Sequence, residues 1–169
     1  MAGNSVGIRL LPLEDRYTGV RRIMIFTKRF RYRFGDIDDA GIAYYPSFFH
    51  YFHCAFEDWW SDGLQTPYDT VLHQEKFGLP AVHIETDFLQ PVRYGDEPDI
   101  HLGILHIGDT SVKFGYWMTL PNSDKPLCRA RITTVSVNMD TMTKQSVPTK
   151  WREAFQQYLI PEGQFPTTE

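Results

Sequence analysis

The segment from Pro46 to Ser61 constrains the fold more than any other part of the sequence, because large apolar residues recur in it at helical spacing. Two neighbouring stripes carry these residues: Phe48, Phe52, Ala55 and Trp59 on one, Phe49, Phe56 and Trp60 on the other. Polar residues are confined to a narrow strip: His50, His53, Glu57, Asp58 and Ser61. A helix that is apolar over most of its circumference must be buried inside a domain. Pro46 suits its first turn, and Gly63 suits its end.

Most of the remaining sequence is strand-like. Alternating apolar and polar residues predict strands at 26–34, 81–90, 99–107, 111–120 and 127–139. Gly108-Asp109 lies between two of these strands and predicts a hairpin turn. The short connections between the later four strands favour a meander, in which each strand pairs with the next. An antiparallel sheet of about five strands that covers one apolar helix must curve around it, so the predicted class is α+β.

A chain of 169 residues is long enough for one domain with its own core. We expect this domain at residues 26–160. Residues 1–25, with scattered glycine, proline and charge, are interpreted as an N-terminal extension. Residues 161–169 contain two prolines and little to bury, and are interpreted as a flexible tail.

Charge and cysteine content exclude several classes of protein. A net charge of −4 argues against bulk binding of nucleic acid, although a local basic patch would be enough to hold a smaller polyanion. Cys54 and Cys128 have no partners at the spacing of a zinc site, so reduced thiols, a cytoplasmic location and no metal are expected. Residues 1–20 lack the apolar core of a signal peptide, and no run is long enough to span a bilayer.

The most specific pattern lies just ahead of the predicted helix. Asp36, Asp38 and Asp39 fall within four positions, and like charges this close repel one another unless donors stabilise them. The first N–H groups of a helix are such donors, and they can also hold the oxyanion that forms when a carbonyl is attacked. A carboxylate beside them suits acyl transfer. Taken alone, however, the residues favour an Asp-rich turn that caps the helix.

A resemblance to a known family favours the acyl-transfer interpretation. Residues 35–46 resemble the active-site signature of the 4-hydroxybenzoyl-coenzyme A thioesterase family of hotdog proteins, which reads Gly-Asp-x-Asp-x-Ala-Gly-Ile-x-x-Tyr-Pro. Residues 88–96 resemble the family's second strand and its Pro-x-x-x-Gly-Asp turn, and the element order is similar over about 27–155. The resemblance implies a hotdog fold and an acyl-CoA thioesterase without a cofactor, since coenzyme A belongs to the substrate. It also implies a homodimer or homotetramer with active sites between protomers.

The resemblance also implies roles for individual residues. Asp38 takes the place of the catalytic carboxylate, which acts as nucleophile or general base, and the backbone N–H of Tyr45 polarises the thioester carbonyl. His53 stands where the family prototype has an aspartate that binds a phenol, and Leu79 stands where it has a threonine near the substrate. These two differences argue against 4-hydroxybenzoyl specificity, so the acyl group is left as aromatic or of short to medium chain length.

Four further candidates rest on weaker arguments. Tyr44 is a possible contact of the acyl group. Glu57 is a second choice for the catalytic carboxylate, because related hotdog thioesterases place a glutamate on this helix. Lys113 and Lys144 are candidates for binding the phosphates of coenzyme A, although ordinary exposed lysine is the simpler interpretation of both.

Two other functions stay open at this point. A hotdog enoyl-CoA hydratase or dehydratase typically pairs its aspartate with a histidine five residues later, and the residue at that distance from Asp38 is Ala43. A non-catalytic acyl-CoA-binding module would keep the fold and use the carboxylates only for capping.

Overall fold

The long apolar helix lies at the centre of the fold. The structure, a computed structural model, describes residues 6–13, 21–161 and 163–166. Helix α1 spans Tyr45–Asp58 and continues as one π-helical turn, η2, over Trp59–Gly63. Pro46 lies in the first turn and the helix ends at Gly63, so both predicted boundaries are confirmed.

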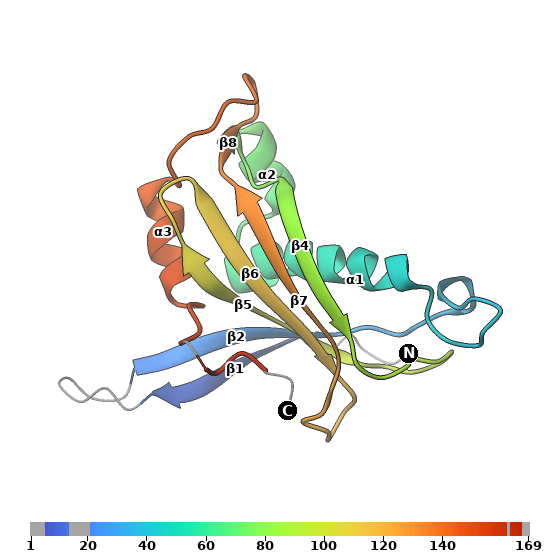
Figure 1. The fold of residues 1–169 in the computed structure, drawn as a ribbon. Helices are drawn as coiled ribbons and strands as arrows, with labels where there is room; N and C mark the ends of the chain where they lie inside the picture. The colour runs from blue at the N-terminus through green and yellow to red at the C-terminus, as the bar shows by residue number, and fades with distance from the viewer. Residues whose placement is uncertain (1–5, 14–20, 162, 167–169) are drawn as a thin grey trace.

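A six-stranded antiparallel sheet curves around α1, in the order β1-β2-β5-β6-β7-β4. Its strands are β1 (Val6–Leu13), β2 (Arg21–Arg29), β4 (Ala81–Phe88), β5 (Asp99–Ile107), β6 (Ser111–Thr119) and β7 (Pro126–Val135). The smaller elements are η1 (Phe34–Asp36), α2 (Tyr68–His73), α3 (Thr149–Gln156) and a two-stranded sheet of β3 (Phe77–Gly78) and β8 (Val137–Asn138). The predicted layer of sheet around one helix, the hotdog arrangement, is confirmed (Figure 1).

Two details of the predicted sheet are wrong. The strand expected at 26–34 lies earlier, as β2 at Arg21–Arg29. A further strand, β1, precedes it and pairs with it over all eight residues of β1. Part of the segment expected as an extension, 1–25, therefore belongs to the sheet, whereas residues 1–5 and 14–20 lie outside the described residues. The expected meander holds for β5, β6 and β7 only, because β4 crosses to the far edge and pairs with β7.

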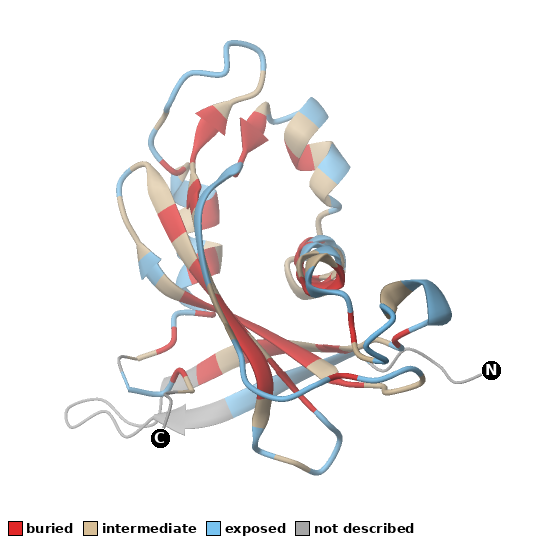
Figure 2. Ribbon diagram, turned by 45° about the vertical axis from the view of Figure 1, so that its right-hand side comes forward, coloured by how far each residue is buried: buried red, intermediate tan, exposed pale blue. Residues whose placement is uncertain are grey.

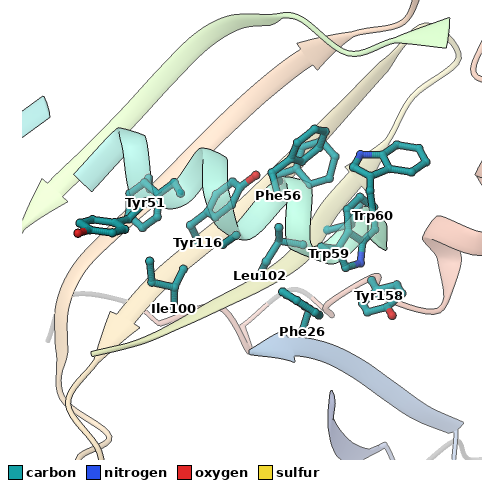
Figure 3. Packing of buried hydrophobic residues seen from close by; sticks show 14 of the residues in the cluster. Phe26, Tyr51, Phe56, Trp59, Trp60, Ile100, Leu102, Tyr116 and Tyr158 are labelled. Atoms are coloured by element: carbon teal, nitrogen blue, oxygen red, sulfur yellow. The ribbon is translucent and has the colours of Figure 1, made fainter. Parts of the chain in front are cut away.

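The core lies between α1 and the concave face of the sheet. Figure 2 looks along α1, which lies inside the curve of the sheet with its buried residues facing the strands. Phe52 and Phe56 of α1 contact Tyr116 and Phe114 of β6, with ring centroids 5.1 and 5.5 Å apart. Phe26, Ile100 and Leu102 complete this surface from β2 and β5 (Figure 3). Burial of so many rings is the main stabilising contribution.

The chain after α3 crosses from the inside of the sheet to the outside. Residues 157–160 pass between β2 and β5, where Met24 N donates to Gln157 O (2.9 Å) and Ile104 N donates to Tyr158 O (2.8 Å). Phe165 then lies on the outer face, 5.9 Å from the ring of Trp117 and 4.7 Å from the guanidinium of Arg131. The segment expected as a flexible tail, 161–169, is thus anchored at Phe165, and its residues 162 and 167–169 lie outside the described residues.

A pair of glycines makes room for this segment. Gly103 of β5 and Gly115 of β6 are paired on neighbouring strands. A Cβ on Gly115 would lie 2.8 Å from the ring of Phe165, and one on Gly103 would collide with the side chain of Ile160. The outer face of the sheet therefore has a gap that the end of the chain fills.

Candidate active site

The loop between β2 and α1 is tied to the helix by Asp36. Its Oδ2 accepts hydrogen bonds from Arg33 N and from the Tyr51 hydroxyl, both at 2.7 Å. Its carbonyl oxygen accepts a third from Tyr44 N, also at 2.7 Å. Burial and the hydrogen bond to Asp36 raise the pKa of Tyr51, so its hydroxyl stays protonated as the donor. Asp36 therefore has a structural role, which separates it from the other two carboxylates of the loop.

Asp38 lies in a tight turn whose shape comes mainly from the backbone. Asp38 N donates to Ile42 O (3.0 Å), and Gly41 N donates to Asp38 O (2.9 Å). Gly41 has a φ of +74°, in the left-handed region that favours glycine. The Asp38 side chain is exposed, and its Oδ1 accepts the Ala40 N–H at 2.9 Å. One carboxylate oxygen is thus used by the turn, and the second makes no hydrogen bond to any residue that the structure describes.

Asp38 and Tyr45 line one cavity of about 400 Å³ at the N-terminal end of α1. The other walls are Ile42, Ala43 and Phe48 on one side and residues 88–92, from the end of β4 into the following loop, on the other. The structure therefore brings together the two residues predicted to be catalytic. Asp39, the third carboxylate, is exposed and does not line this cavity.

Among the described residues, the N–H of Tyr45 is a helix-terminal donor that has no acceptor. Pro46 has no N–H, and Ser47 N already donates to Tyr44 O at 2.8 Å. Tyr45 is the first residue of α1, so its N–H has no acceptor within the helix, and none is found elsewhere among the described residues. This N–H carries part of the positive end of the helix dipole, and a carbonyl oxygen that enters the cavity can accept its hydrogen bond.

A second cavity of about 360 Å³ lies farther along α1 and contains His53 and Leu79, two of the predicted substrate-binding residues. It lies between α1, α2, the start of β4 and the strands β6 and β7. Its lining is predominantly apolar: Phe49, Phe52, Phe56, Leu72, Ile84, Ile132, Met139 and Met142 all contribute to it.

A cluster of three rings separates the two cavities. Phe88 of β4 lies 5.1 Å from Phe48, which lines the first cavity, and 6.5 Å from Phe49, which lines the second. The Phe88 ring is 50% exposed, so it is not locked into the core. The two cavities are therefore neighbours along the boundary between α1 and β4.

The other predicted residues are placed less favourably. Tyr44 is exposed, with its ring 5.4 Å from that of Tyr45, and it lines neither cavity. Glu57 is exposed and pairs with His53 through a 3.0 Å contact. Lys113 lies on the outer face of β6, because its neighbours in the strand point to the core, and Lys144 is exposed near β8. Neither lysine lines the cavity that contains Asp38 and Tyr45.

Sequence reasoning missed two residues that contribute to these cavities. Phe88 was read only as part of a strand, and Tyr116 only as one of the apolar positions of its strand. The signal for Tyr116 was available, since a tyrosine among Val112, Phe114 and Met118 puts a hydroxyl on the core face.

Among residues 6–13, 21–161 and 163–166, no group of three or more His, Cys, Asp or Glu side chains is arranged to hold a metal ion.

Known relatives resemble this chain over most of its length. A 1,4-dihydroxy-2-naphthoyl-CoA hydrolase of Picosynechococcus is 30% identical over 137 residues, which is 74% of this chain and 88% of the relative. The hydrolase of that name from Synechocystis is 27% identical over 129 residues, covering 76% and 93% of the two chains.

Solved structures share the fold. The crystal structure of a 1,4-dihydroxy-2-naphthoyl-CoA thioesterase from Synechocystis superposes with a TM-score of 0.70 at 26% identity, covering 78% of this chain and 96% of that one. A thioesterase superfamily structure from Jannaschia gives a TM-score of 0.74 at 23% identity, covering 80% and 94%. The model of the Thioesterase-like superfamily matches residues 32–159, which includes both cavities, and this chain therefore belongs to that superfamily.

Proposed function

We propose that this protein is an acyl-CoA thioesterase that hydrolyses an aromatic acyl-CoA to the free acid and coenzyme A, with Asp38 as its catalytic carboxylate. The observation that carries the proposal is that Asp38 and Tyr45, the residue whose helix-terminal N–H is open, line the same cavity. The names of the relatives support the reaction and favour an aromatic acyl group. Short and medium acyl chains stay as alternatives.

The proposed chemistry needs only these two groups and water. The thioester oxygen accepts the Tyr45 N–H, which stabilises the negative charge that develops on it. The carboxylate of Asp38 then either takes a proton from a water that adds to the carbonyl carbon, or adds to that carbon itself. In the first route the C–S bond breaks and the thiolate of coenzyme A recovers the proton. In the second route a mixed anhydride forms as the thiolate leaves, and water then hydrolyses the anhydride to the free acid.

The apolar cavity that contains His53 and Leu79 suits the acyl group. Its volume of about 360 Å³ and its ring-rich walls fit an aromatic system better than a short chain, which would leave much of the apolar surface uncovered. Glu57 is a weaker candidate for the catalytic carboxylate than Asp38, because it pairs with His53 and does not line the cavity that Asp38 and Tyr45 line. The binding of coenzyme A phosphates by Lys113 and Lys144 stays a prediction.

We also propose that the active form is a homodimer that pairs through β4. This strand is at the edge of the sheet and is exposed along most of its length (Figure 2). Val82, Ile84 and Phe88 expose 60, 46 and 50% of their surface. An exposed apolar edge strand is a site where another strand pairs. A second copy of β4 would cover it next to both cavities, and sedimentation at micromolar concentration would test this.

The location of the protein stays a prediction. Cys54 and Cys128 are both free in the described part of the chain, which is compatible with the cytoplasmic location expected from the sequence. Within the same residues, no helix combines the length and apolar character needed to cross a membrane.

Thiol release from a panel of acyl-CoA esters tests the proposed function. Aryl esters should release coenzyme A faster than short-chain or medium-chain esters, and crotonyl-CoA should not be hydrated. Hydration of crotonyl-CoA would favour the hydratase, although Ala43, which lines the cavity where that enzyme would need a histidine, argues against it. Tight binding of aryl-CoA without thiol release would favour a non-catalytic binding module.

A further inference from the structure

One polar group lies deep in the apolar cavity. Tyr116 of β6 is 3% exposed and lines the cavity from the sheet side. Its ring lies 5.1 Å from that of Phe52, and its hydroxyl points toward the part of α1 that carries Phe56 (Figure 3). The hydroxyl is therefore at the inner end of the cavity, among the rings that form its floor.

The Tyr116 hydroxyl has no hydrogen-bond partner among the described residues, unlike three other tyrosines that lie in the core or pack against it. Tyr158 donates to Gly63 O at 3.2 Å, Tyr68 accepts the Leu79 N–H at 3.0 Å, and Tyr32 contacts the sulfur of Met118 at 3.9 Å. A hydroxyl on an otherwise apolar wall leaves its hydrogen bond to whatever occupies the cavity. Burial raises the pKa of Tyr116, and the hydroxyl therefore stays protonated and able to donate.

The hydroxyl is open to the cavity and not sealed within the core. The sealed side-chain atoms without partners in the described residues are Nε1 of Trp59, Nε1 of Trp60 and Oγ1 of Thr86. The oxygen of Tyr116 is not among them, which agrees with its place on the cavity wall. A molecule in the cavity can therefore reach it.

The other polar side chains that the structure describes around this cavity differ from Tyr116 in position or in partners. His53 lines the cavity, but its side chain is 63% exposed and already pairs with Glu57, so it lies at the mouth. The hydroxyl of Thr134 donates to Val112 O at 3.1 Å, and that of Tyr68 accepts the Leu79 N–H at 3.0 Å, which holds it on the α2 side of the cavity. Among the described residues, Tyr116 thus carries the hydroxyl on the sheet side of the cavity that makes no hydrogen bond.

We propose, building on the proposed function, that the Tyr116 hydroxyl forms a hydrogen bond with an oxygen substituent at the far end of the acyl group. Tyr116 then determines specificity, because it favours a hydroxylated aryl group over the unsubstituted one. The dimensions agree with this role. Tyr45 and Phe52 are seven residues apart on α1, or about 10 Å along the axis, which is close to the length of a two-ring acyl group. The proposal concerns the walls that the acyl group meets, whichever protomer supplies Asp38.

Tyr116→Phe tests the proposal because it removes one oxygen and keeps the ring. The substrates are two matched pairs, 1,4-dihydroxy-2-naphthoyl-CoA with 2-naphthoyl-CoA and 4-hydroxybenzoyl-CoA with benzoyl-CoA. The variant should lower kcat/KM for the hydroxylated member of at least one pair by about tenfold or more, because the substrate oxygen loses its partner in an apolar site. For the unsubstituted member, kcat/KM should be unchanged or raised.

Tyr32→Phe is the matched control, since Tyr32 is buried and lines neither cavity. In each substrate pair, this variant should leave the ratio of kcat/KM for the hydroxylated member to kcat/KM for the unsubstituted member unchanged. Equal losses on both members of each pair in Y116F, or no change on either, would overturn the role of Tyr116 while leaving the thioesterase intact. Absence of thiol release in the wild type would instead refute the proposed function. In that case, calorimetry would measure the affinities of wild type and Y116F for 1,4-dihydroxy-2-naphthoate and 2-naphthoate. A loss of affinity in Y116F for the hydroxylated acid alone would support the role of Tyr116, and equal affinities would overturn it.

Discussion

Asp38→Asn tests the catalytic carboxylate most directly, because the structure allows the side chain to lose its charge without losing its place. Oδ1 of Asp38 accepts the Ala40 N–H at 2.9 Å, and the amide oxygen of Asn can accept the same bond. The bonds from Asp38 N to Ile42 O and from Gly41 N to Asp38 O come from the backbone and are unaffected. The free energy of unfolding should therefore change by less than about 0.5 kcal/mol, as for most surface substitutions.

The effect on catalysis should be much larger. A positioned base contributes about 10²–10⁴-fold to the rate, and a neutral amide can neither take the proton of water nor attack the carbonyl. We expect kcat on the best aryl-CoA to fall by this factor, which corresponds to about 3–5 kcal/mol of transition-state stabilisation. KM should change little, because the lost interaction acts on the reacting carbon. Continuous thiol release measures both parameters.

Asp39→Asn is the control for charge alone. Asp39 is the next residue, is exposed, and makes no hydrogen bond or ion pair within the described residues, so its kcat should stay close to the wild-type value. The reasoning fails if D38N keeps wild-type turnover on every ester of the panel. It also fails if D39N shows the same loss as D38N, because the cause would then be the net charge of the loop.

Three further perturbations test other parts of the structure. Tyr45→Pro deletes the proposed oxyanion donor, and the position accepts proline because the preceding residue, Tyr44, is extended at φ −61° and ψ 124°. The kcat of this variant should fall by about 10²–10³. The loss should be far smaller in Tyr45→Ala, which keeps the N–H. Burial lowers the pKa of His101 to about 4 from 6.5, so between these pH values the unfolded chain binds a proton that the folded chain does not. Urea denaturation should show a stability contribution of up to about 3 kcal/mol that is complete above pH 6.5, falls toward pH 4 and is absent in His101→Gln. Gly115→Ala should lower the free energy of unfolding by about 1–3 kcal/mol, because its Cβ would lie 2.8 Å from the ring of Phe165, and adding Phe165→Ala should cost less than the sum of the single changes.

The fold was predictable where one local pattern was enough. The period and ring content of residues 46–61 give a buried helix, and a buried helix requires a sheet around it. The alternation at 30–34 wrongly predicted a strand there. Phe30 N and Tyr32 N do donate backbone hydrogen bonds, to Pro98 O (3.1 Å) and Asp96 O (2.9 Å), but this segment lies outside any regular strand. The edge position of β4 was not predictable, since the ten residues between β4 and β5 allow it to pair with either neighbour.

The candidate site, like the fold, was predictable only where it depends on residues close together in the sequence. Asp38 and Tyr45 are seven residues apart and belong to one turn and one helix start, so their proximity follows from local sequence. The apolar cavity combines α1 with β4, β6 and β7, and the place of Tyr116 in it depends on strand pairings that the sequence does not encode locally. Lys113 could have been judged better, because alternation with Val112 and Phe114 already puts it on the face opposite the helix.

The gap over Gly103 and Gly115 on the outer face has a practical consequence. The chain passes between β2 and β5 at residues 157–160 and then fills this gap, so Phe165 and Pro166 lie on the face of the sheet that points away from α1. Cargo joined after this point, whether a fluorophore, a bead or a second enzyme, would be carried on the reverse side of the molecule. Both cavities would stay accessible to a ligand as large as an acyl-CoA, which makes this end the natural point for immobilising the protein.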